Sequence, residues 1–399
     1  MNALLAIGIA LISGYIVGKL IQKAKIPAVG GYIIAGLVIG KSLLHIVPDT
    51  MLNALSPVSD VALGLIAFSI GGELEWKTLK KVGKSIPIIA FFEAFTAFVF
   101  VTSILLIVGL DLPSALLLGA VSSATAPAAT VMVLNELRAK GPLTSTLIAV
   151  VAIDDAICLM IYAIASSISK VLFSHADNIS WGKTLVAPVE EIFFSLLLGS
   201  LVGIGFVFIL KIVKESHEIL VVAIGTILIL SGIASKLGLS ALLTCMAMGT
   251  MIANFSNHKR RVFSILDNIS PPVYTAFFVL AGARLDVHLL MKIGLYGVVY
   301  TIFRILGKVL GASIGATISK SNSVVKKYVG FGLLSQVGVA VGLAMVIAKE
   351  FAQYGEIGSM VITILLATTV ITELIGPLCT KYAVIKSGEV GKADLDNVH

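Results

Sequence analysis

Apolar residues fill this chain in runs of about 20, which short polar breaks separate from end to end. A helix of ~20 apolar residues is long enough to cross the ~30 Å hydrocarbon core of a bilayer. A membrane β-barrel would instead need ~10-residue segments in which apolar and polar residues alternate. The pattern therefore predicts an all-α polytopic membrane protein with about 13 transmembrane helices, at residues 3–21, 26–44, 55–72, 85–109, 113–134, 143–170, 189–212, 218–235, 239–255, 271–285, 289–318, 325–348 and 357–383.

Composition supports the same fold class and leaves no room for a soluble domain. Of the 399 residues, 58% are apolar and 13% are charged, whereas soluble globular proteins carry about 25% charged residues. We therefore predict that residues 1–399 form a single integral membrane domain and that the chain is not an enzyme. Cys158, Cys245 and Cys379 all fall in apolar runs without metal-ligand spacing, so we expect no cofactor.

Basic residues are distributed unevenly between alternate loops. One set of loops holds 20 Lys and Arg residues, and the other set holds seven. By the positive-inside rule the richer set faces the cytoplasm. We therefore expect the N-terminus outside and the tail at 384–399 inside, in the cell (inner) membrane of a prokaryote. This asymmetry explains the net charge of +7, so nucleic acid is not an expected partner.

The chain shows self-similarity at an offset of about 210 residues. Phe68–Glu75 is echoed by Phe278–Asp286, with one residue inserted. Two inverted six-helix repeats, at 1–170 and 218–383, joined by a linker helix within 171–217, account for this offset and for 13 spans. Inverted repeats are typical of transporters that open a midplane site alternately to each side. Chance similarity between Leu- and Gly-rich helices is the alternative.

Corresponding spans of the two repeats contain helix-breaking residues. The fifth span contains Ser122–Pro127, and Pro127 removes a backbone donor from its helix. The twelfth span carries glycines around Ser335 and Gln336. Breaks in corresponding positions indicate a binding site, because unwound carbonyls can coordinate a cation. Ser123 and Gln336 are therefore candidate accessory residues.

Two adjacent aspartates, Asp154 and Asp155, lie in the middle of the apolar sixth span. A charge at the bilayer centre costs at least about 2.5–3.5 kcal/mol on insertion scales, so something must compensate it. The two carboxyl groups are about 100° apart around a helix and need not share one role. Lys308 in the eleventh span is the best intramembrane partner, and Arg304, one turn earlier, is the second. A purely structural buried salt bridge is the alternative.

This chemistry points to exchange of a cation for a proton. Burial disfavours a charged carboxylate, so a buried Asp can bind a proton near physiological pH. The same oxygen atoms can bind sodium or lithium, and competition between the ions couples two opposed fluxes. Two further buried acids are weaker candidates. Glu93 in the fourth span is expected to have a packing or salt-bridge role, and Glu373 is expected near the cytoplasmic end of the last span.

These features resemble the monovalent cation:proton antiporter superfamily, and within it the NapA-like prokaryotic Na+/H+ antiporters, over essentially the full chain. The matching motifs are Asp154-Asp155 after the break at Thr125-Ala126-Pro127, the Gly-Lys-Val-Leu-Gly sequence at 307–311, and Phe278–Leu285. The resemblance implies a core of six helices with two crossed, discontinuous helices. This core would move in an elevator fashion against a dimerisation domain in a homodimer.

The resemblance also implies residue roles. Asp155 would be the essential ion and proton carrier, with Asp154 as the partner of Lys308. Thr125 and Thr130 would lie near the site at the first break. The chain departs from this branch in two places: Ser335–Gly338 replaces an Arg-Gly-Glu stretch, and Arg304 adds a second intramembrane base. The chain also ends at His399 without the nucleotide-binding domain of Kef-type potassium efflux systems, which disfavours potassium.

We therefore predict a secondary active antiporter that exchanges Na+, and also Li+, for H+ by alternating access, with Asp155 and Asp154 binding the transported Na+. If sodium breaks the Asp154–Lys308 pair, protons leave both Lys308 and Asp155, which predicts electrogenic exchange. The alternatives are a K+/H+ antiporter of the same superfamily and a sodium-coupled solute symporter. An intramembrane aspartyl protease is disfavoured, because both midspan aspartates lie on one helix. A further alternative is a receptor that is built on the same scaffold but does not transport.

Overall fold

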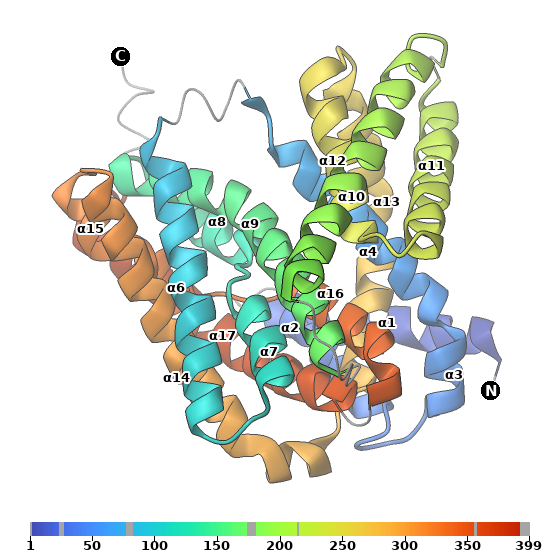
Figure 1. Ribbon diagram of the computed structural model, residues 1–399, viewed down its shortest axis with the longest axis horizontal. Coiled ribbons are helices and arrows are strands. Elements are labelled where there is room, and N and C mark those ends of the chain that lie inside the picture. Colours follow the sequence, from blue (N-terminus) through green and yellow to red (C-terminus); the bar gives the residue numbers. More distant parts are fainter. Residues whose placement is uncertain are drawn as a thin grey trace.

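The computed structural model describes residues 2–23, 28–76, 83–173, 181–213, 215–354 and 357–391 (Figure 1). These residues form helices and no strands, which confirms the predicted all-α class. The helices are α1 (Ala3–Gln22), α2 (Ala28–Ile39), α3 (Asp49–Ala54), α4 (Ser56–Glu73), α6 (Ser85–Ile107), α7 (Leu112–Ser122), α8 (Pro127–Glu136), α9 (Pro142–Phe173), α10 (Trp181–Ile209), α11 (Ser216–Lys236), α12 (Ala241–Phe255), α13 (Lys259–Ala283), α14 (Val287–Ile318), α15 (Ser323–Tyr328), the 3-10 helix η1 (Val329–Leu333), α16 (Gly338–Glu350), the 3-10 helix η2 (Ala352–Tyr354) and α17 (Ile357–Ser387).

Each predicted span overlaps one of these helices or a broken pair of them, although α13 begins at Lys259, well before the predicted start at 271. Within the described residues, eight helices are long and apolar enough to cross a membrane by themselves. The pair Ser323–Leu333 and Gly338–Glu350, bent by 47°, would make a ninth. Helices α2, α7 and α12 are apolar but shorter. The total of 13 spans therefore stays a prediction, and residues 392–399 of the predicted tail lie outside the described chain.

Side-chain caps fix where several helices begin. Asp111 accepts a hydrogen bond from Ser114 N at the start of α7, and Asp286 accepts from Leu289 N at the start of α14. Such caps satisfy backbone donors that lack a partner in the first turn. The backbone N–H of Leu289, together with Lys41 at 3.1 Å, lowers the pKa of Asp286 from its usual value. The start of α14 is therefore fixed to the loop that follows α2.

The helices pack into two bundles, each of which draws on both halves of the chain. One bundle contains α6, α7, α8, α9, α14, α15, α16 and α17, with α6 and α14 side by side along their length (Figure 1). The other contains α1, α2, α4, α11, α12 and α13, with α10 packed on α12. This mixing accords with the predicted repeats, although their inverted symmetry and their boundaries stay predictions.

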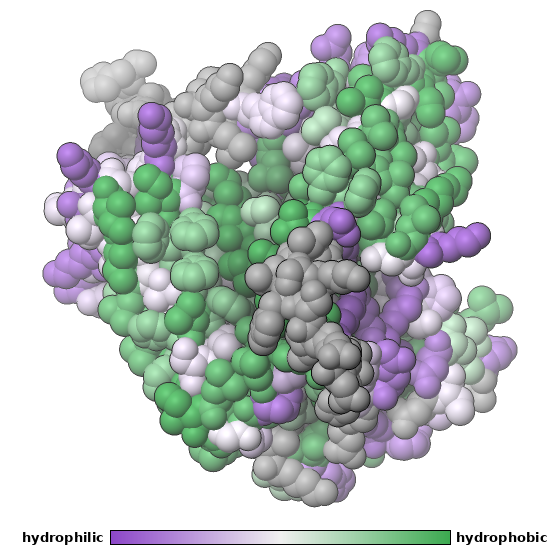
Figure 2. All heavy atoms as spheres, in the orientation of Figure 1, coloured by the Kyte–Doolittle hydropathy of each residue, from purple (hydrophilic) through white to green (hydrophobic). Residues whose placement is uncertain are grey.

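Glycine permits the closest helix contacts in both bundles. A Cβ added to Gly311 of α14 would lie 2.4 Å from Phe92 O of α6. A Cβ added to Gly71 of α4 would lie 2.0 Å from Met246 O of α12. Small residues at such contacts let backbones approach where lipid supplies no hydrophobic driving force between helices. Apolar side chains cover much of the outer face of both bundles in Figure 2, as expected of a lipid-facing surface.

Candidate functional site

The two predicted helix breaks meet inside the bundle that contains α9. Helix α7 ends at Ser122 and α8 begins at Pro127, while η1 ends at Leu333 and α16 begins at Gly338. The backbone N–H of Ala126 in the first break donates to Ser335 O in the second at 2.9 Å. The hydroxyl of Thr130 donates to Gly332 O at 2.7 Å. Thr130 therefore joins the two broken helices directly, in addition to any role near an ion.

Arg304 binds the backbone carbonyls that the breaks expose. Its fully buried guanidinium donates to Ser122 O at 3.1 Å and Ala124 O at 2.8 Å in the first break. It also donates to Leu334 O at 2.6 Å and Ser335 O at 3.5 Å in the second. The sequence predicted Arg304 as a second partner for the aspartates. Its hydrogen bonds go to backbone carbonyls instead, so this prediction is wrong. The planar guanidinium carries five donors, a set that suits several carbonyls at once.

Lys308, one turn along α14, binds carboxylates instead. Its buried ammonium forms its shortest contact with Glu93 of α6. It also donates to Ser123 O and Thr125 Oγ1, each at 2.7 Å, and lies 3.5 Å from Asp154 Oδ2. The predicted pair with Asp154 is therefore present, but Glu93 is the closer partner. The expectation of a salt-bridge role for Glu93 is confirmed, although its base could not be named from sequence.

Thr125 connects Lys308 to the aspartate pair. Its hydroxyl accepts from Lys308 and donates to Asp154 Oδ2. Among the described residues, Asp154 Oδ1, Asp155 Oδ1 and Glu93 Oε2 are buried oxygen atoms without a hydrogen-bond partner. The carboxylate of Asp155 interacts electrostatically with Asp154, Glu73 and Lys308. Glu73, at the end of α4, is exposed.

The remaining polar residues of the crossing have structural partners. The amide nitrogen of Gln336 donates to Val121 O at 2.8 Å and lies 2.9 Å from Tyr300 Oη, which fixes the second break to α7 and α14. The Ser123 hydroxyl donates to Ala120 O within α7, so only its carbonyl reaches Lys308. Sequence reasoning missed Tyr300, a buried hydroxyl one turn before Arg304 on α14.

Glu373 is not where the sequence placed it. We predicted a position near the cytoplasmic end of the last span, but Glu373 lies in the middle of α17 with its side chain 2% exposed. A Cβ added to Gly376, one turn away, would lie 2.1 Å from Ser335 Oγ. Glu373 is therefore adjacent to the second break. Its Oε1 has no hydrogen-bond partner among the described residues.

The crossing can thus bind a small cation through carboxylate, hydroxyl and carbonyl oxygens. Hard cations prefer such oxygen ligands, and the unpartnered oxygens of Asp154 and Asp155 are available. Within the described chain, no group of three or more His, Cys, Asp and Glu residues has the arrangement of a resident metal site.

Comparison with known proteins decides the family. A family model described as sodium/hydrogen exchanger, transmembrane, matches residues 7–386. The chain belongs to the sodium/hydrogen exchanger family. It is 23% identical to the high-affinity Na+/H+ antiporter NhaS3 of Synechocystis sp., over 92% of this chain and 87% of that protein. It is 24% identical to the Na+/H+-K+ antiporter GerN of Bacillus cereus, over 94% of this chain and 95% of that protein.

Solved structures share the fold of this exchanger. The sodium proton antiporter MjNhaP1 from Methanocaldococcus jannaschii matches with a TM-score of 0.80 at 20% identity, over 96% of this chain and 98% of that chain. Identity at this level shows a shared fold. The family membership confirms the predicted cation:proton antiporter resemblance.

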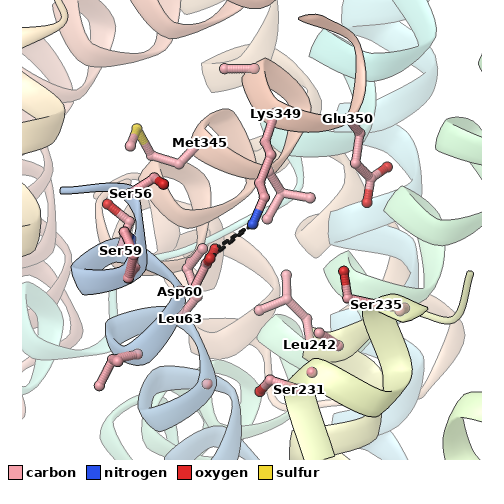
Figure 3. A pocket seen from close by; sticks show the side chains of 18 of the residues that line it. Ser56, Ser59, Asp60, Leu63, Ser231, Ser235, Leu242, Met345, Lys349 and Glu350 are labelled. Atoms are coloured by element: carbon pink, nitrogen blue, oxygen red, sulfur yellow. Dashed lines mark hydrogen bonds and ion pairs between the residues drawn. The ribbon is translucent and has the colours of Figure 1, made fainter. Parts of the chain in front are cut away.

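A large cavity contains charged and hydroxyl side chains among apolar ones and is called the polar cavity below (Figure 3). It has a volume of about 1110 Å³ and lies between α4, α9, α11 and α16. Asp60 of α4 and Lys349 of α16 form an ion pair across it, with Lys349 Nζ at 2.8 Å and 2.9 Å from the two carboxylate oxygens. Since α4 and α16 belong to different bundles, this pair joins the two bundles at the cavity.

An apolar layer separates this cavity from Asp155. Leu159 lies on α9 one turn from Asp155, and Tyr162, two turns away, lines the cavity. Around Leu159 the structure leaves a void of only about 10 Å³, which is room for at most one water molecule. The residues that line this void, called the apolar plug below, are Leu63, Ile66, Ala67, Ile70, Leu159, Leu242, Val339 and Gly342. The site is closed on this side.

Replacing Arg304 should destabilise the exchanger. Among the described residues, no other side chain donates as many hydrogen bonds to the carbonyls of both breaks. Arg304→Lys keeps the charge but loses the planar fork, so at least two hydrogen bonds worth about 0.5–1.5 kcal/mol each should disappear. We expect a lower midpoint of thermal unfolding in detergent and lower exchange. Arg261→Lys is the matched control, since Arg261 is exposed and contacts Ser216. Equal unfolding midpoints for both variants would contradict this role.

Proposed function

We propose that this chain is a secondary active antiporter that exchanges Na+, and also Li+, for H+ by alternating access. The observation that carries the proposal is the pair of buried aspartates, each with an unpartnered oxygen, beside Lys308 where two broken helices cross. Membership of the sodium/hydrogen exchanger family supports the same function.

In this proposal Asp155 is the carrier of both ions. It lies beside Asp154 and within the electrostatic field of Glu73 and Lys308. Protons neutralise the two aspartates when the site is without sodium, and Na+ replaces them through carboxylate and break oxygens. Thr125 orients Asp154 through its hydrogen bond, and Glu93 holds Lys308 beside the aspartates as an ion pair.

We further propose a homodimer in the inner membrane of a prokaryote, with the N-terminus outside. The orientation is supported by the loop charges, and by the cavity, which Lys236, Arg284 and Lys349 of the sparser basic set line together. The exposed apolar side chains of α1 favour contact with lipid or with a second subunit. The bundle that contains α9 would move against the other bundle during transport.

Potassium is the second candidate for the transported cation. The relative GerN is named as an Na+/H+-K+ antiporter, which favours testing K+ beside Na+ and Li+. A sodium-coupled solute symporter is disfavoured, because an organic solute gives no reason for two buried aspartates beside Lys308. Exchange measured in liposomes with each cation separately, with and without added solutes, distinguishes these candidates.

Asp155→Asn should abolish exchange, because the amide keeps the shape of the side chain but cannot bind a proton or carry charge. We expect less than about a tenth of the wild-type rate of sodium-dependent proton movement in proteoliposomes, with normal membrane insertion. Asp286→Asn is the matched control, since Asn also caps a helix well. A higher residual rate in Asp155→Asn would refute Asp155 as the carrier.

Crosslinking across the polar cavity should stop exchange, because transport through this side must separate α4 from α16. The variant is Asp60→Cys with Lys349→Cys, made after Cys158, Cys245 and Cys379 are replaced by Ser. A short, reducible bis-thiol crosslinker should block exchange, and reduction should restore it. Each single cysteine, treated in the same way, is the control. Undiminished exchange in the crosslinked protein would rule out this route.

Exchange should be electrogenic, although by a different route from the one that the sequence suggested. Glu93 is the closer partner of Lys308, so sodium at Asp154 leaves that ion pair in place. Asp154 Oδ1 and Asp155 Oδ1 are both unpartnered, so each can hold one proton that a single Na+ displaces. With the membrane potential clamped by potassium and valinomycin, the rate should change with the imposed potential. A wild-type rate that ignores the potential would defeat this expectation.

A further inference from the structure

One buried acid near the crossing has no part in the proposed ion site. Glu373 is 2% exposed, and its Oε1 has no hydrogen-bond partner among the described residues. Ser335 Oγ and Thr369 Oγ1 are likewise buried and unpartnered. Thr369 precedes Glu373 by one turn on α17, so both lie on one face of that helix. Three oxygen atoms without partners thus line one strip of the interior.

This strip lies against the second break. Gly376, one turn after Glu373 on the same face, contacts Ser335 so closely that an added Cβ would be 2.1 Å from its hydroxyl and 2.8 Å from its backbone nitrogen. Ser335 is also the residue whose carbonyl Arg304 reaches at 3.5 Å, the longest of the four guanidinium contacts. Glu373 and Arg304 therefore approach the same short segment from two helices, α17 and α14.

Arg304 is a fully buried base that contacts the second break from α14, and Glu373 lies against the same break from α17. Other charged residues also lie on the helices packed against α17. Lys349 and Glu350 of α16 line the polar cavity, and Asp154 acts on Arg304 from α9. On α17 itself, Lys381 is exposed. The remaining acidic, basic and histidine residues of α17 and the helices packed against it are Lys386 of α17, Glu136 of α8, Asp155 and Lys170 of α9, Lys259, Arg260, Arg261 and Asp267 of α13, His288, Lys292 and Lys308 of α14, and Lys326 and Lys327 of α15.

The physical consequence is that Glu373 needs either a proton or the guanidinium of Arg304. A buried carboxylate without a hydrogen-bonded partner is strongly disfavoured, and a bound proton removes the charge. Arg304 is already bound to carbonyls of both breaks, yet its contact with Ser335 O is long enough to be exchanged for a stronger one. A charged acceptor forms a stronger hydrogen bond with a guanidinium than a carbonyl does.

We propose that Glu373 is a second proton-binding group of the exchanger, separate from the aspartate pair. Its proton determines whether Arg304 keeps its contact with Ser335 O in the second break. The inference rests on the proposed function. When Glu373 is protonated, Arg304 stays on Ser335 O. When the proton leaves to water, the carboxylate accepts a hydrogen bond from Arg304 Nη2 and the contact with Ser335 O breaks, which loosens the second break.

Glu373→Gln tests the effect on transport. Gln has nearly the same shape and cannot ionise, so Arg304 should stay on Ser335 O at every pH. The variant should insert normally and exchange sodium for protons. As pH rises, its exchange rate should depart from that of the wild type, because only the wild type can lose the Glu373 proton. We expect the exchange rates of the variant and the wild type to differ by at least about two-fold at alkaline pH. This is near the lower end of the effects that mutations between two coupled sites produce. Thr363→Val, which removes another buried hydroxyl of α17, should keep the wild-type pH profile.

A second measurement does not depend on transport. Infrared difference spectra of the purified wild type between acidic and alkaline pH should contain a protonated-carboxyl band that Glu373→Gln lacks and Thr363→Val retains. The proposal is overturned if the band is unchanged in Glu373→Gln, or if its pH profile of exchange superimposes on that of the wild type. Absence of exchange in the wild type would instead refute the proposed function and leave the infrared result to decide on Glu373.

Discussion

The structure depends on how a membrane protein satisfies the backbone of two broken helices. In hydrocarbon, each unpaired carbonyl costs several kcal/mol, so a break survives only where protein groups bind the freed atoms. Here one side chain, Arg304, binds carbonyls of both breaks, while Thr130 and Ala126 N join the broken segments directly. The irregular backbone that can coordinate an ion exists because α14 supplies these donors.

The same helix sets the charge of the site. Arg304 is compensated by carbonyl dipoles, and Lys308, one turn later, is compensated by Glu93. Asp154 and Asp155 are then left without a full countercharge of their own. In the proposed mechanism such a site is stable only while it holds cations, whether protons or sodium, and this requirement would be the physical basis of exchange. A fixed lysine with a dedicated acid would then make the aspartate pair available to the transported ions.

Much of this arrangement could be predicted from the sequence, because the bilayer imposes strong patterns. Apolar runs of about 20 residues located the helices, Pro127 marked the first break, and the aspartate pair stood out in an apolar span. Pairing of charges could not be predicted, since it depends on which helix faces meet. Lys308 binds Glu93 because glycines such as Gly311 bring α14 against α6. The partners of Arg304 and the position of Glu373 were predicted wrongly, because a linear pattern does not show which segments of neighbouring helices meet.

The two bundles explain how a closed site can open without unfolding. Within each bundle, helices meet through glycine contacts that leave no room for sliding, as at Gly71 against Met246 O. Between the bundles, the contacts near the polar cavity include the apolar plug, the exposed Asp60–Lys349 pair and the hydrogen bond from Ser167 of α9 to Glu191 of α10. Exposed ion pairs contribute only about 0–1 kcal/mol, and apolar surfaces slide without breaking directional bonds. Movement at this interface, beside Asp155, would expose the proposed carrier.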